Sequence, residues 1–495
     1  MPDSSLKLRT ARSVKWSAID RLSSQVVYAV TGIVLAWLLS PSEFGLVGAV
    51  LVFQAFASII IDSGFSYALI QRKNPTRLDY STVLWFNLGM SVVLYALLYL
   101  CAPLIADCFQ SDQRLIPLSR VMFLTIILNA SATVQINQLT KQMHMRPVAV
   151  ANVVSLILGG ALGILLAYRG YGAWAIVWQA VANSGIKSLL LWLTSKWLPL
   201  MQFSWQALKG FFAVGSGMMA TSILNTVFLK IYYFLIGNQS GMASLGYYSQ
   251  GDKWSTMGIS SISQTLTSSF LPPLSAAQDD PDRFRRLCSK MNRLTAYMLF
   301  PILAGLIVMA TPIFHTIFGV KWDLAIPIFQ LLLVRGIFTV LNGLYSNYML
   351  ALGRSGLVMK MEIVRDATAL VALAITWPYL KLEPIDDPVL GVKIMIYGQI
   401  AASFAAWCVT LACATRISGA SVIGYLRDCA PYAALTAIIV PLLWWISTLQ
   451  WHPALLLAAQ AVAGAGLYLL ANYLLHSKIQ ADALAYATGK MKIEA

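Results

Sequence analysis

The chain has 495 residues, of which 58% are apolar and only 11% charged, and its formal net charge is +15. Soluble domains carry about a quarter charged residues, so the composition excludes an ordinary soluble enzyme or nucleic-acid-binding protein. Apolar runs long enough to cross a bilayer recur along the chain, which predicts an all-α polytopic membrane protein. Because no catalytic, nucleotide-binding or metal-binding motif occurs, we expect no enzyme activity, no catalytic residue, no metal and no cofactor.

Fourteen membrane spans are predicted in chain order. They cover residues 14–39, 43–68, 80–103, 115–138, 148–168, 173–194, 210–236, 243–271, 292–312, 324–350, 356–378, 390–412, 430–448 and 453–475. With the N-terminus in the cytoplasm, the cytoplasmic segments hold 23 of the 35 Lys and Arg residues and the external loops hold five. This asymmetry follows the positive-inside rule and predicts that both termini are cytoplasmic.

Two stretches of the chain are similar to each other. "APLIADCFQSDQRLIPLSRV" begins at Ala102 and "TPIFHTIFGVKWDLAIPIFQ" begins at Thr311, and in both a Pro closes an apolar helix before an Ile-Pro pair opens the next. A repeat of six spans predicts two pseudo-symmetric six-helix lobes around a central cavity, followed by two more helices. The expected domains are residues 1–205, 206–420 and 421–495. A chance likeness between helix-end prolines is the alternative.

Several predicted spans are more polar than a structural helix bundle requires. The segment Gly246–Phe270 is the most polar, because it carries Asp252, Lys253 and a long series of Ser, Thr and Gln residues. Such a helix is typical of the lining of a water-filled cavity. Lys253 lies about 15 Å below the outer end of its span at 1.5 Å per residue, which places it near the middle of the membrane.

Basic and amide side chains inside the spans are candidate substrate contacts, since an ionised group in hydrocarbon is costly. The cavity candidates are Arg21, Lys187, Asn225, Lys230, Lys253 and Arg335. Arg21 and Lys253 are the strongest of these. Lys187 and Lys230 could instead extend to the membrane interface, and Asp20 could neutralise Arg21. A basic cavity favours an anionic ligand, above all a pyrophosphate.

Carboxylates inside the spans are candidates for coupling transport to protons or sodium. They are Asp62, Glu362 and Asp366. A salt bridge within the helix bundle explains Glu362 and Asp366 equally well, because Arg365 stands three residues after Glu362, a spacing that pairs opposite charges, and next to Asp366.

One long stretch resembles a known family. "LSPSEFGLVGAVLVFQAFASIIIDSGFSYALIQRKNPTRLDYSTVLWFN" (Leu39–Asn87) is similar to the polysaccharide transport family of O-antigen, colanic acid and exopolysaccharide flippases, within the MOP superfamily. Further similar stretches are "LGYYSQGDKW", "LPPLSAAQDDPDRFRR", "FGVKWDLAIPIFQLLLVRG" and "LALGRSGLVMK". The resemblance covers roughly residues 12–420.

The resemblance implies the two-lobed fold and a transport function. Flippases of this family move undecaprenyl-pyrophosphate-linked oligosaccharide repeat units across the bacterial inner membrane by alternating access, for O-antigen, capsule or exopolysaccharide synthesis. The implied partners are the lipid-linked oligosaccharide, membrane lipids, a polysaccharide polymerase and other assembly proteins. Family members often have an acidic residue where Lys230 stands. The alternative is a cation-coupled drug exporter of the MATE type, which should place carboxylates in its cavity.

The most basic predicted cytoplasmic loop has the sequence "DDPDRFRRLCSKMNR" and begins at Asp279. We expect it to meet lipid head groups or an incoming pyrophosphate, because clustered Lys and Arg attract anionic lipids. A plain signal for membrane topology is the alternative reading of this loop.

Overall fold

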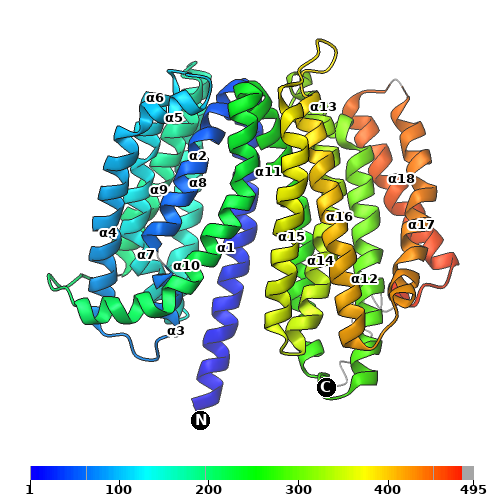
Figure 1. The fold of residues 1–495 in the computed structure, drawn as a ribbon, viewed down its shortest axis with the longest axis horizontal. Coiled ribbons are helices and arrows are strands. Elements are labelled where there is room, and N and C mark those ends of the chain that lie inside the picture. Colours follow the sequence, from blue (N-terminus) through cyan, green and yellow to red (C-terminus); the bar gives the residue numbers. More distant parts are fainter. Residues whose placement is uncertain (1, 63, 196, 450, 482–495) are drawn as a thin grey trace. The chain divides into compact units, whose positions relative to one another are not determined.

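The computed structural model describes residues 2–62, 64–195, 197–449 and 451–481. Within these ranges the chain forms α-helices and two short 3-10 helices, with no strand (Figure 1). The chain divides into two compact units, Met1–Gly246 and Tyr247–Ala495. The all-α class is therefore confirmed, while the domain limits expected at residues 205 and 420 stay a prediction.

The first unit contains ten helices before the boundary region. They are α1 (Pro2–Leu38), α2 (Pro41–Asp62), α3 (Phe65–Gln71), α4 (Arg77–Leu100), α5 (Ala102–Cys108), α6 (Leu115–Met122), α7 (Leu124–Lys141), α8 (Met145–Tyr168), α9 (Ala173–Ser195) and α10 (Trp205–Gln239). In this unit α8 packs against both α1 and α9, and α4 packs against α7. Helix α11 (Gly241–Ser275) begins in the first unit and continues into the second.

The second unit is also built from helices. Its remaining elements are α12 (Pro281–Val308), α13 (Ala310–Ile317), η1 (Val320–Trp322), α14 (Ala325–Ala351), α15 (Ser355–Thr376), η2 (Trp377–Lys381), α16 (Leu390–Ser418), α17 (Val422–Ser447) and α18 (Pro453–Leu474). Helix α16 packs against α14 and α15, and α17 packs against α12 and α18. Within this unit α13 lies at the end opposite to the first turns of α12 (Figure 1).

Each of the fourteen expected spans overlaps a helix or a pair of consecutive helices. Within the described residues, eleven helical segments are long and apolar enough to cross a membrane. The expected spans that fall on α9, α11 and α15 are not among these eleven. Polar residues account for this in α11 and α15, since α11 carries the Ser, Thr and Gln series and α15 carries four charged side chains. The chain is thus a multi-pass membrane protein, and the count of fourteen stays a prediction.

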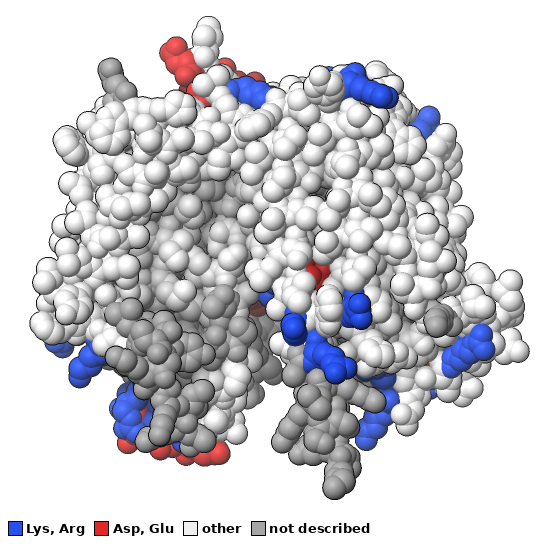
Figure 2. Space-filling view, turned by 180° about the vertical axis from the view of Figure 1, so that it is seen from behind, with Lys and Arg blue, Asp and Glu red and all other residues white. Residues whose placement is uncertain are grey.

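The surface agrees with a membrane environment. On the face drawn in Figure 2, blue and red side chains gather mainly near the ends of the helices, and the surface between them is largely white. Large apolar side chains lie exposed along the helices, among them Leu100, Ile438 and Val462, each 73–75% exposed. A soluble monomer rarely exposes so much apolar surface, so this belt fits contact with lipid chains.

The suspected repeat appears as the same sequence of elements in both units. A long helix ends, a short helix follows at once, and a further α-helix follows after a short connection: α4, α5 and α6 in the first unit, and α12, α13 and α14 in the second, where the connection contains η1. The expectation that Pro103 and Pro312 close the preceding helix is wrong. Both prolines lie in the first turn of the short helix, where the missing N–H of proline is not needed for helical hydrogen bonding.

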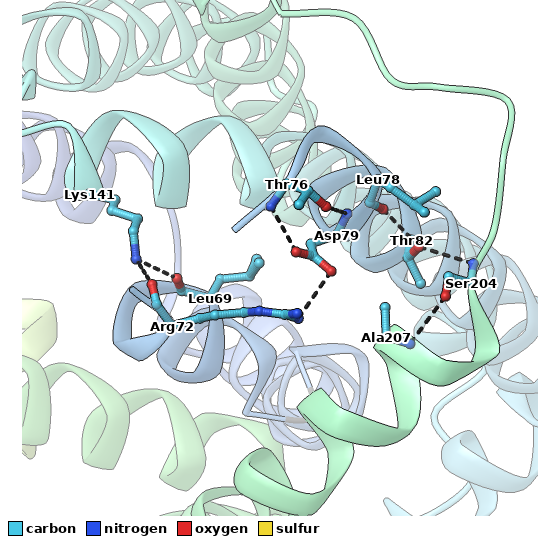
Figure 3. Close-up of polar contacts among 9 residues, drawn as sticks. All are labelled: Leu69, Arg72, Thr76, Leu78, Asp79, Thr82, Lys141, Ser204 and Ala207. Carbon is cyan, nitrogen blue, oxygen red and sulfur yellow. Dashed lines mark hydrogen bonds and ion pairs between the residues drawn. The ribbon is translucent and has the colours of Figure 1, made fainter. Parts of the chain in front are cut away.

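A network of hydrogen bonds holds the loop between α3 and α4 (Figure 3). Asp79 accepts a hydrogen bond from the backbone N–H of Thr76 at 2.7 Å and one from Arg72 Nη1 at 3.0 Å. Thr76 Oγ1 in turn accepts from the backbone N–H of Asp79, which completes a capping box at the start of α4. Lys141, at the end of α7, donates to the carbonyls of Leu69 and Ile70 at 3.1 and 2.9 Å and also to that of Arg72.

The same hydrogen-bond network holds the segment that leads into α10. The backbone N–H of Ser204 donates to Thr82 Oγ1 at 3.2 Å, and Ser204 Oγ caps α10 by accepting from the N–H of Ala207 (Figure 3). Arg77 donates twice to the carbonyl of Leu198, at 2.8 and 3.1 Å. Since these groups come from α3, α4, α7 and α10, this hydrogen-bond network connects four helices at one end of the first unit.

Candidate functional site

The second unit contains a polar network built around Arg335 of α14. Arg335 Nη1 donates to Oε1 of Gln399, on α16, at 2.5 Å, and Nη2 lies 3.5 Å from Oδ1 of Asp252, on α11. Gln399 Nε2 donates to the hydroxyl of Tyr248 at 3.5 Å. The guanidinium therefore joins three helices of this unit through side chains alone.

The network is only partly accessible. The side chains of Arg335 and Asp252 are each 23% exposed, whereas Gln399 and Tyr248 are buried. A charge inside a membrane protein requires partners, because an unpaired ion in a low-dielectric surrounding is strongly destabilised. Asp252 supplies that partner here. An anionic ligand that approached Arg335 would therefore compete with Asp252.

Close approach of α11 and α14 brings the members of this network together. A Cβ atom added at Gly251 would lie 2.8 Å from Cγ2 of Ile328, and one added at Gly336 would lie 2.3 Å from Cδ1 of Ile259. Small residues at helix interfaces in membranes let the backbones approach each other closely. These two glycines therefore let α11 and α14 pack closely, and Asp252 and Arg335 stand next to them in the sequence.

Lys253 is directed differently from its neighbour Asp252. Its side chain is half-buried, and Nζ lies 4.9 Å from the ring centroid of Trp254, within the range of a cation–π contact. Consecutive residues of an α-helix point about 100° apart, since 3.6 residues complete a turn. Asp252 thus forms an ion pair with Arg335, while Lys253 lies on another face of α11.

The carboxylates of α15 form one local cluster. Arg365 Nη1 lies 2.5 Å from Oε2 of Glu362, and Arg365 Nη2 lies 2.9 Å from Oδ1 of Asp366. The expected network of these three residues is confirmed. Both carboxylates that we singled out for ion coupling are therefore already ion-paired with the same guanidinium.

Asp62, at the end of α2, lies in a chain of short-range polar contacts in the first unit. Its carboxylate accepts a hydrogen bond from Ser66 Oγ, on α3, and Ser66 Oγ accepts from Nδ2 of Asn137, on α7, at 2.8 Å. The carboxylate is half-buried. Asp62 thus connects three helices, and a change in its charge would act on all of them.

The basic candidates of α1 and α9 lie near another polar contact. Asp20 accepts hydrogen bonds from Ser24 Oγ at 3.2 Å and from Asn152 Nδ2, on α8, at 3.1 and 3.2 Å. These partners of Asp20 are neutral, and Arg21 next to it is exposed. Lys187 on α9 is half-buried.

The remaining two candidates lie on α10. Asn225 is exposed, and Lys230 is half-buried with Nζ 4.5 Å from the ring centroid of Tyr233. Residues three apart share one face of a helix, so this cation–π contact forms within α10 itself. Part of the cost of placing Lys230 in an apolar helix is offset in this way.

The structure therefore distributes the candidates over both units. Arg21, Asp62, Lys187, Asn225 and Lys230 lie in the first unit. The other four, Lys253, Arg335, Glu362 and Asp366, lie in the second. Their arrangement around one cavity stays a prediction. The sequence reasoning missed Gln399, because a single Gln in an apolar helix is a weak signal, and it did not pair Asp252 with Arg335.

Comparison with known proteins first defines the class. The fold matches that of the lipid II flippase MurJ in an inward closed conformation, with a TM-score of 0.75 over 94% of this chain and 100% of that one, at 13% identity. At this identity the likeness shows the fold alone.

The family follows from the sequence relatives. Residues 34–327 match the family described as "Polysaccharide biosynthesis protein", and the chain belongs to this family. It is 28% identical to the teichuronic acid biosynthesis protein TuaB of Bacillus subtilis, over 69% of this chain and 71% of TuaB. It is 25% identical to the succinoglycan biosynthesis transport protein ExoT of Rhizobium meliloti, over 73% of each chain. The resemblance that the sequence motifs indicated is thus confirmed.

Proposed function

We propose that this protein is a flippase that moves undecaprenyl-pyrophosphate-linked oligosaccharide repeat units across the bacterial inner membrane by alternating access. The observation that carries the proposal is the family match over residues 34–327 on a fold like that of a lipid II flippase. The product would serve synthesis of O-antigen, capsule or exopolysaccharide. The protein acts as a transporter without enzyme activity, and both of its termini lie in the cytoplasm.

The proposed substrate contacts are basic, which suits a pyrophosphate. Arg21, Lys187, Asn225, Lys230, Lys253 and Arg335 would face the head group in a polar cavity. Guanidinium and ammonium groups bind phosphate oxygens through charge-assisted hydrogen bonds. Arg335 would exchange Asp252, at 3.5 Å, for the incoming phosphate, because its second acceptor Gln399 is neutral and can stay bound.

Coupling to a proton or sodium gradient would use carboxylates. Asp62 is the stronger of the proposed coupling residues, because the Ser66 hydroxyl that donates to it is neutral. Glu362 and Asp366 would have to release Arg365 first. A polysaccharide polymerase and other assembly proteins are the proposed protein partners. The lipids of the surrounding membrane are the other proposed partners.

Deletion of the gene followed by lipid analysis tests the proposal. Loss of one surface glycan, together with build-up of its undecaprenyl-pyrophosphate-linked repeat unit inside the cell, is expected. Normal glycan with no intermediate would contradict the proposal. Increased drug sensitivity of the deletion strain with normal glycan would instead favour the MATE-type exporter.

Lys253 gives a sharper test at the level of the site. We expect Lys253→Ala to restore glycan export to the deletion strain only weakly, because a head-group contact is lost, and Lys253→Arg to restore it well. Lys478→Ala, which removes an exposed lysine beyond α18, is the matched control. Protein levels in the membrane are measured by immunoblot for all three variants. Full export by Lys253→Ala would remove this residue from the proposed site.

A further inference from the structure

A basic cavity lies in the second unit between the first turns of α12 and the turn that joins α16 to α17. Its volume is about 710 Å³. Three arginines line it, Arg285 and Arg293 from α12 and Arg427 from α17, together with two serines and two tyrosines. Asp428 is the carboxylate among the lining residues.

The charges in this cavity do not cancel. Arg293 Nε donates to Oδ1 of Asp428 at 2.7 Å, and Asp428 is only 8% exposed, so Asp428 neutralises Arg293. Arg285 lies 3.9 Å from Asp282, which is 77% exposed, and water screens such a pair strongly. Arg427 is exposed. The lining therefore presents two guanidinium groups beyond the one that Asp428 neutralises, and the N-terminal end of α17 adds positive potential of the same sign.

The turn after α16 is shaped to hold one of these arginines. Gly419 ends α16 with a φ of 65°, in the left-handed region that glycine adopts without strain. A Cβ atom at this position would lie 3.0 Å from Nη2 of Arg285. The bare glycine thus lets the guanidinium lie directly against the backbone of the turn and fixes the rim of the cavity.

A second cavity, which is apolar, lies further along the same helices. It has a volume of about 410 Å³ and is lined mostly by apolar residues of α12, α17 and α18. Its first lining residue on α12, Tyr297, follows Arg293 by one helical turn, or about 6 Å. Beside the basic cavity, Ile423 and Leu426 on α17 are 77% and 42% exposed. The seam between α12 and α17 thus changes from basic to apolar along its length.

We infer that this seam binds an anionic glycerophospholipid of the surrounding membrane. The phosphate group would lie between Arg285 and Arg427, and one acyl chain would enter the apolar cavity. A phosphodiester matches guanidinium donors in charge and geometry, and an acyl chain gains from burial along an apolar wall. The basic segment that begins at Asp279 is then more than a topology signal, since its arginine at position 285 contacts a lipid. A lipid-linked pyrophosphate shares the phosphate chemistry, and the experiment below separates the two sources.

The test compares lipid binding to the purified full-length protein by native mass spectrometry, with dioleoyl-phosphatidylglycerol against dioleoyl-phosphatidylcholine. We expect wild-type protein to prefer phosphatidylglycerol and Arg285→Gln/Arg427→Gln to bind it about tenfold more weakly, which is the scale of a lost charge-assisted contact. Arg283→Gln/Arg286→Gln is the matched control, because it removes two exposed charges next to the cavity that are not part of its lining. Arg293 is left intact so that Asp428 keeps its partner.

Two further arms identify the ligand. Gly305→Leu places a side chain at the wall of the apolar cavity, where an added Cβ meets no atom within 4 Å, so we expect weaker binding of the dioleoyl lipid and unchanged binding of dihexanoyl-phosphatidylglycerol. Inorganic pyrophosphate should not displace the lipid. Equal phosphatidylglycerol binding by the glutamine variant would overturn the inference. Displacement by pyrophosphate would also overturn it and assign the cavity to the lipid-linked substrate.

Discussion

At the scale of single residues, the Arg335 guanidinium has two acceptors, one charged and one neutral. Asp252 lies 3.5 Å from Nη2, and Gln399 accepts from Nη1 at 2.5 Å. This division matters for a transporter, because the ion pair can open while the hydrogen bond to Gln399 keeps the guanidinium oriented. The pair is only 23% exposed on each side, so water replaces a lost partner poorly.

A double-mutant cycle measures this ion pair. We expect Arg335→Gln and Asp252→Asn to destabilise the protein singly, and the double variant to be less destabilised than their sum by about 1 kcal/mol, as found for groups in direct contact. The measurement is the unfolding temperature of the purified protein in detergent. The cycle of Arg365→Gln with Glu362→Gln is the comparison, since that pair is 42% and 46% exposed and should couple by only about 0.3 kcal/mol. Equal coupling in both cycles would contradict the structural distinction.

The sequence was informative about which residues are polar but not about their partners. Arg335, Lys253 and the α15 carboxylates stand out because ionised groups are rare in apolar spans. Glu362 could be paired with Arg365 in advance, because residues three apart share one face of a helix. The contact of Asp366 with the same guanidinium does not follow from that spacing, since the two residues are adjacent. Asp252 could not be paired with Arg335, since the two lie on different helices and only the packing of α11 on α14 brings them into contact.

At the scale of elements, the loop between α3 and α4 is held by a lysine that caps another helix. Lys141 donates to the carbonyls of Leu69, Ile70 and Arg72, which α3 leaves without helical partners at its C-terminal end. A cation at a helix C-terminus is also favoured by the helix dipole. The end of α7 therefore stabilises the end of α3 through one side chain.

We expect Lys141→Ala to lower the free energy of unfolding by about 1.5–3 kcal/mol, the range for hydrogen bonds to a charged group. Lys73→Ala, in the same loop, removes an exposed lysine and should change stability by less than about 0.5 kcal/mol. Thermal unfolding of both purified variants provides the measurement. If the two variants unfolded at the same temperature, the capping role of Lys141 would be wrong.

Hydropathy located most elements because length and apolar content are properties of the local sequence. It placed Pro103 and Pro312 at the ends of long helices, whereas each lies in the first turn of a short one. A proline marks a break between helices without indicating on which side of the break it lies, since both positions spare the missing N–H. The similar order of short and long helices in both units could be seen only once these breaks were placed.

At the scale of the whole molecule, the distribution of Lys and Arg predicts one orientation in the membrane. A green fluorescent protein fused at the C-terminus should fluoresce, because it folds in the cytoplasm. Alkaline phosphatase inserted at Asp386, in the exposed loop between η2 and α16, should be active, because it requires the periplasm. The reverse pattern, or an inactive phosphatase at Asp386 with a fluorescent C-terminus, would contradict the predicted topology.

The central claim is that the protein itself moves a lipid-linked oligosaccharide between leaflets. The most direct test uses liposomes that contain the purified protein and an undecaprenyl-pyrophosphate-linked repeat unit placed in one leaflet, with a membrane-impermeant glycosidase added on the other side. We predict that the glycan becomes accessible to the glycosidase with wild-type protein and more slowly with Lys253→Ala. Accessibility no greater than in protein-free liposomes, with the protein folded and inserted, would contradict the account.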